Sequence, residues 1–104
     1  MKNVTITFFP YDEECAIVTE SAEVVVRHDG DVMVIDVAGA AGRSKYLLTG
    51  RRSGHVYAAG LNEAPGSLQR VSAQWARVGD SIIGKWIENS REYLFEFSMP
   101  DDDD

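Results

Sequence analysis

The sequence predicts an all-β protein, an antiparallel up-and-down meander of about eight strands that forms a small barrel or a barrel-like sandwich. Three observations predict it. Apolar and polar residues alternate with a period of two along most of the chain, and the helical period is nearly absent. Dipeptides typical of tight turns separate the alternating segments.

One domain accounts for the whole chain. Its 104 residues, 44% of them hydrophobic, are enough for a single core. We assign residues 1–100 to this β domain and residues 101–104 to a disordered acidic tail, because a run of like charges is solvated and repels itself.

The strands follow from the alternation and from the residues that interrupt it. Pro10 ends the first strand, because proline cannot donate to a ladder hydrogen bond. We expect a loop over residues 38–42, a turn over residues 64–67 and a short extra strand near residues 15–19. The main strands are predicted at residues 2–9, 22–28, 31–38, 44–50, 55–61, 68–78, 81–88 and 91–99.

The turn dipeptides also predict how the strands pair. Asp29-Gly30 favours a type I′ turn, which would place Val24 opposite Ile35 and Val26 opposite Met33. Further turns at Gly79-Asp80 and Asn89-Ser90 would place Gly84 between the rings of Trp75 and Phe95. Together the last two registers place one set of residues on a single face: Val71, Ala73, Trp75, Ile82, Gly84, Trp86, Tyr93, Phe95 and Phe97.

A faint internal repeat supports the meander. Gly54 and the alternating residues after it recur 25 positions later, from Gly79 onward. Closure into a barrel is expected because eight strands in one flat sheet would leave apolar faces bare. The Trp-and-Gly meander resembles the final hairpins of lipocalin-like barrels over about a third of the chain, but it lacks a diagnostic motif and no family is assigned.

The net charge of the chain limits which classes of partner are expected. Ten Lys and Arg against seventeen Asp and Glu give a net charge of −7, which disfavours phosphate backbones and anionic lipid surfaces. We therefore expect no nucleic-acid and no membrane partner. Cys15 is the single cysteine, so no internal disulfide can form, and the N-terminal residues alternate like a strand instead of a signal peptide. We expect a cytoplasmic protein.

No set of residues in the sequence predicts catalysis. His28 and His55 fall at or beside predicted turns, with no Ser or Cys placed near them, and Cys15 follows three acidic residues that disfavour a thiolate. Glu88 and Arg91 are predicted to form a surface ion pair across the last turn. We expect no enzyme, no metal site and no cofactor.

One hairpin is apolar on both faces, and it predicts a contact surface. In the predicted register Val25 lies opposite Val34 and Arg27 lies opposite Val32, on the face turned away from Val24. We predict that Val25, Arg27, Val32 and Val34 bind another protein or a second copy of this chain. The predicted function is a non-catalytic acidic binding protein, such as an accessory, inhibitor or immunity-type factor.

The alternative is a small lipocalin-like barrel that binds an apolar small molecule. Its ligand would lie against Trp75, Trp86 and Tyr93, which could also simply fill the interior of an eight-stranded barrel. A void beside these rings favours the alternative, and a filled interior removes it.

Overall fold

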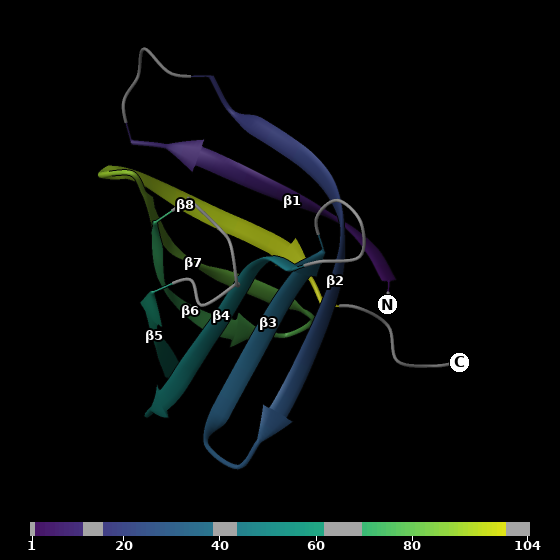
Figure 1. The fold of residues 1–104 in the computed structure, drawn as a ribbon, viewed down its shortest axis with the longest axis vertical. Coiled ribbons are helices and arrows are strands. Elements are labelled where there is room, and N and C mark those ends of the chain that lie inside the picture. The colour runs from purple at the N-terminus through teal and green to yellow at the C-terminus, as the bar shows by residue number, and fades with distance from the viewer. Residues whose placement is uncertain (1, 12–15, 39–43, 62–69, 100–104) are drawn as a thin grey trace.

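Eight antiparallel strands close into a small barrel (Figure 1). The computed structural model describes residues 2–11, 16–38, 44–61 and 70–99, and these residues contain no helix. Each strand pairs with the next along the chain, and β1 also pairs with β8. The predicted meander is confirmed, and it closes into a barrel.

The strands lie close to the predicted ranges, with one clear difference at β2. The predicted extra strand near residues 15–19 and the strand at 22–28 are one continuous strand, because residues 18–24 all pair with β1. The strands are β1 (Lys2–Pro10), β2 (Val18–Asp29), β3 (Val32–Ala38), β4 (Ser44–Ser53), β5 (Val56–Leu61), β6 (Val71–Val78), β7 (Ser81–Glu88) and β8 (Arg91–Ser98).

Some predictions fall on residues that the structure does not describe. Cys15, residues 39–42 of the predicted loop, the turn at 64–67 and the acidic tail at 101–104 are among them. Ala38, the first residue of the predicted loop, is instead the last residue of β3. Pro10 is the last residue of β1, as predicted.

The register of the last three strands is confirmed. Trp75 pairs with Gly84, and Gly84 pairs with Phe95. The turn at Asn89-Ser90 has positive φ at both residues, as a type I′ turn requires. Two independent turns therefore fix the same inward face.

The register predicted for the β2–β3 hairpin is wrong by two residues. Val24 pairs with Val37 and not with Ile35, because Gly30-Asp31 forms the turn instead of Asp29-Gly30. Positive φ occurs at Gly30 but not at Asp31, which is the pattern of a type II′ turn with glycine in first place. Since side chains alternate with a period of two, the shift leaves the predicted inward set unchanged: Val24, Val26, Met33 and Ile35.

The sequence repeat corresponds to two similar hairpin ends. Arg52 Nε donates to the carbonyl oxygen of Gly54 over 2.9 Å, and Arg77 Nε donates to that of Gly79 over 3.0 Å. Both glycines open two-residue turns, which connect β4 to β5 and β6 to β7.

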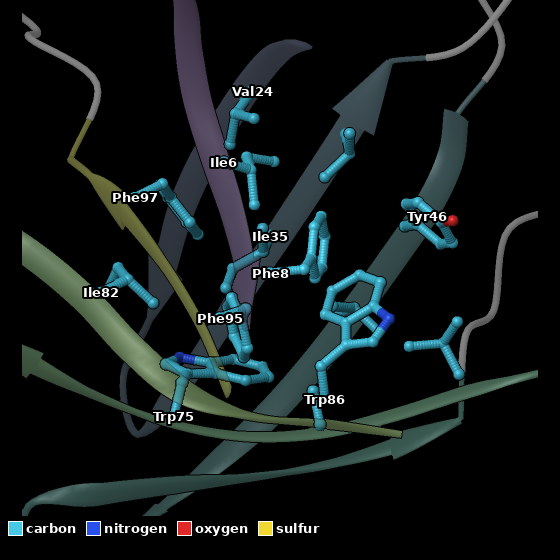
Figure 2. Packing of buried hydrophobic residues seen from close by; sticks show 14 of the residues in the cluster. Ile6, Phe8, Val24, Ile35, Tyr46, Trp75, Ile82, Trp86, Phe95 and Phe97 are labelled. Atoms are coloured by element: carbon cyan, nitrogen blue, oxygen red, sulfur yellow. The ribbon is translucent and has the colours of Figure 1, made fainter. Parts of the chain in front are cut away.

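The interior is filled around Trp75. Its side chain is 1% exposed, stacks on Tyr57 at a centroid distance of 6.1 Å and donates from Nε1 to Met33 Sδ over 3.0 Å. The buried core comprises Ile6, Phe8, Val24, Met33, Ile35, Val37, Tyr46, Leu48, Val71, Ala73, Trp75, Ile82, Trp86, Phe95 and Phe97, most of which Figure 2 shows.

Gly84 lets β6 and β7 approach closely beside Trp75. A Cβ atom at this position would lie 2.7 Å from Trp75 Cα and would collide with the carbonyl oxygen of Gln74. Gly84→Ala should therefore lower the free energy of unfolding by about 1–3 kcal/mol, because backbone atoms would have to move. Urea unfolding followed by tryptophan fluorescence measures the change.

Gln74→Ala is the matched control for this variant. It lies on the strand that packs against Gly84, but its side chain is exposed, so the change should stay within about 0.5 kcal/mol. Equal unfolding midpoints for Gly84→Ala and the wild type would contradict the close approach.

Candidate functional site

The two ends of the barrel differ in their connections. Two-residue turns join β2 to β3, β4 to β5 and β6 to β7 at one end. At the other end, here called the loop end, β1, β3, β5 and β7 end and β2, β4, β6 and β8 begin, and the turn at Asn89-Ser90 joins β7 to β8 there. Apart from that turn, successive strands are separated by more residues of sequence at this end, and binding residues more often lie at the end of a scaffold that carries its longer connections.

A pocket of about 130 Å³ opens at the loop end. It lies where β1 and β7 end and where β2, β4 and β8 begin. Its lining combines four aromatic rings, two carboxylates and one aliphatic side chain: Phe8, Val18, Glu20, Tyr46, Trp86, Glu88 and Tyr93.

Trp86 is the centre of the aromatic lining. Its ring meets Phe8 at a centroid distance of 5.1 Å and Tyr46 at 5.0 Å, both edge to face. Phe8 in turn meets Tyr93 at 6.1 Å. Figure 2 shows the Trp86 indole beside the rings of Phe8 and Tyr46. Such pairs contribute roughly 0.5–1.5 kcal/mol each beyond their buried area, so the rings hold one another in place.

Glu88 ties two of these rings together. Its Oε1 atom accepts a hydrogen bond from Tyr46 Oη over 2.9 Å and a second from Trp86 Nε1 over 3.1 Å. Hydrogen bonds to a charged acceptor are stronger than neutral ones. The carboxylate therefore fixes both polar ring atoms at the edge of the pocket.

The phenol of Tyr46 stays protonated in this setting. Burial raises its pKa well above the usual range, and the charge of Glu88, its hydrogen bond to Glu88 and the charge of Glu20 act in the same direction. Tyr46 is thus a neutral hydrogen-bond donor at neutral pH.

The three predicted ligand-binding residues do not lie together in the structure. Trp86 and Tyr93 line the pocket, whereas Trp75 lies on the far side of Phe95 in the filled part of the interior (Figure 2). The void predicted by the small-molecule alternative therefore lies beside Trp86 and not beside Trp75.

The predicted partner-binding residues lie on the outside of the barrel. Val25, Val32 and Val34 are half-buried there, and Arg27 is exposed. Their predicted pairing is wrong, since the register shift places Arg27 opposite Val34.

The same shift moves Asp36, which lies on this outer face in either register, from a position opposite Glu23 to one opposite Val25. Asp36 now lies opposite Val25, with its carboxylate 3.8 Å from the Arg27 guanidinium and accepting a hydrogen bond of 2.6 Å from Ser44 Oγ. The centre of the face is therefore partly polar. Its role as a contact surface stays a prediction.

Sequence reasoning missed the polar members of the pocket. Glu88 does lie opposite Arg91, as predicted, but its carboxylate also accepts the two ring hydrogen bonds. The sequence does contain a signal for them. Glu20, Tyr46 and Glu88 stand at positions of the apolar–polar alternation that face the inside of the barrel. A charged residue at an inward position near a strand end indicates the mouth of a barrel.

Other site chemistries find little support in the described residues. His28 and His55 are both exposed. Across residues 2–11, 16–38, 44–61 and 70–99, no three side chains of His, Cys, Asp or Glu gather as a metal site would need. The described part of the chain also contains no helix with the length and apolar character that a membrane crossing requires.

Comparison of the chain with protein-family models, curated proteins and solved structures finds no match. What the pocket can bind therefore has to follow from its own side chains.

Replacing Glu88 with glutamine should lower the pKa of Tyr46. One of the negative charges that disfavour the phenolate is removed, while burial, the largest cause, remains. The near-ultraviolet absorbance of phenolate during an alkaline titration measures the shift, and Tyr46→Phe identifies which step belongs to this residue. Coincident curves for the wild type and Glu88→Gln would contradict the coupling.

Tyr46 should also make stability depend on alkaline pH. Its native pKa is raised above the value of 10.0 expected in the unfolded chain, so the stabilisation is complete below about pH 10 and is lost as pH rises further. The loss of unfolding free energy above that pH should be smaller in Tyr46→Phe than in the wild type.

Proposed function

We propose that this protein is a non-catalytic binding protein and that its binding site is the pocket at the loop end. The observation that carries the proposal is the contrast between a filled barrel around Trp75 and an open, aromatic-lined pocket beside Trp86. Ligand pockets typically combine apolar walls with a few placed polar groups, and this lining has that composition.

The size of the pocket limits what can enter it. Its volume of about 130 Å³ is well below the roughly 300–1,000 Å³ of pockets that enclose a drug-sized ligand. The pocket therefore takes one projecting group, and the rest of the ligand stays outside. That group can belong to a small molecule or to a side chain of a partner protein, which links the two functions that the sequence predicts.

The protonation of Tyr46 and the hydrogen bonds of Glu88 support a binding site without catalytic activity. Tyr46 is held in its neutral form, and Glu88 Oε1 is occupied by two hydrogen bonds. A neutral phenol is a poor nucleophile, and the Glu88 oxygen that faces Tyr46 and Trp86 already accepts two hydrogen bonds, so both groups suit binding better than catalysis.

The outer face of Val25, Arg27, Val32 and Val34 is the less favoured location. The Arg27–Asp36 ion pair and the Ser44 hydrogen bond already satisfy its charged groups within one chain. We favour the pocket because its lining faces an open volume.

Binding at the pocket can be mapped by nuclear magnetic resonance. Titration with small aromatic or branched compounds, such as phenol, indole and choline, should shift the amide signals of Phe8, Tyr46 and Glu88 saturably. The signals of Val25 and Val34 on the outer face should stay in place. Shifts confined to the outer face, or none at millimolar ligand, would contradict the proposal.

Two matched variants test the location. Val18→Trp should block the pocket, since Val18 lines it and is 42% exposed, so a larger ring can be placed there without entering the core. Val78→Trp makes the same change at a 60% exposed position at the opposite end of the barrel. Binding should be lost only in Val18→Trp, and binding that survives in it would place the site elsewhere.

A further inference from the structure

We infer that the group bound in this pocket is a methylated ammonium cation, the chemistry shared by choline and by a trimethyllysine side chain. The inference rests on the proposed binding function and names the class of ligand. Three features of the pocket lead to it: its walls, its charge and its volume.

The walls supply four aromatic rings, the kind of side chain from which aromatic cages are built. Phe8, Tyr46, Trp86 and Tyr93 line the pocket together, and the planes of neighbouring rings stand at 71° to 87° to one another. Aromatic faces attract cations through the ring quadrupole, with Trp the most effective, and cages of several rings are used to bind quaternary ammonium groups.

The charge of the described lining has a single sign. Glu20 and Glu88 are both acidic, and no Lys, Arg or His is among the described residues that line the pocket. An anionic ligand would meet both carboxylates, so it is disfavoured. A cation is attracted by the carboxylates and by the rings together.

One of these rings already attracts an ammonium group from its own chain. Lys45 Nζ lies 5.3 Å from the centroid of the Tyr46 ring, within the range of a cation–π contact. Lys45 does not line the pocket, so it leaves the volume open to a ligand.

The volume fits the head of such a ligand. A pocket of about 130 Å³ suits one compact head group and is too small to enclose a whole drug-sized ligand. A trimethylammonium head consists of one nitrogen and three methyl groups. Its charge is spread over methyl surfaces that need no hydrogen-bond partners, and Glu88 Oε1 has already accepted two.

The test compares choline with 3,3-dimethylbutan-1-ol, a neutral molecule of the same shape. Calorimetry should show that choline binds about tenfold more tightly, and that its affinity falls as salt is added. A short peptide with one trimethyllysine should bind the same pocket. Tighter binding of the peptide than of choline identifies a protein as the source of the cation, and tighter binding of choline identifies a small molecule.

Matched charge variants test which carboxylates cause the preference for a cation over a neutral molecule. Glu88→Gln and Glu20→Gln should each weaken choline binding severalfold while binding of the neutral alcohol stays unchanged. Glu96→Gln removes the same charge from an exposed position on the outside of β8 and should leave both affinities as they were. Because Glu20 is exposed and forms no part of the core, Glu20→Gln remains informative if Glu88→Gln fails to fold.

The outcomes separate this inference from the proposed function. Equal affinity of choline and the alcohol, with both bound beside Trp86, overturns the cation inference and leaves a general binding pocket. Absence of binding of choline, peptide and alcohol overturns the cation inference as well, and the compound titration described above then decides whether the pocket binds at all.

Discussion

Closure of the eight-stranded barrel is the constraint on which the rest of the structure depends. It turns the alternation of the sequence into an inside and an outside, and the inside of such a barrel is just wide enough for side chains to fill. Around Trp75 the interior is filled. Gly84 has no side chain, so β6 and β7 can lie close together beside the Trp75 ring. Beside Trp86 the filling is incomplete, and the remaining space is the pocket.

The polar groups at the loop end follow from the same closure. An inward position near a strand end places its side chain at the mouth of the barrel, where part of it is buried and part meets water. Glu88 is tolerated there because two ring donors bind one of its oxygens. Burying the acidic group without such partners would cost several kcal/mol. The hydrogen bonds that satisfy Glu88 also orient the rings of Tyr46 and Trp86 that a ligand would contact.

The sequence predicted most of the fold because two-residue turns specify register locally. Trp75, Gly84 and Phe95 were placed correctly from the turns on either side. The β2–β3 turn was misplaced because glycine fits both the second place of a type I′ turn and the first place of a type II′ turn. The pocket could not be predicted from the sequence, for a different reason. Its lining comes from five strands, and only three-dimensional closure brings them together.

The central claim is that the cage around Trp86 is the binding site of this barrel. Nuclear Overhauser effects between the methyl protons of choline and the side-chain protons of the protein test it most directly, because they report contacts within about 5 Å, the spacing expected for a cation held against a ring. We predict contacts to the rings of Trp86 and Tyr46 and none to Trp75. Contacts to Val34 on the outer face, without any to Trp86, would contradict the claim.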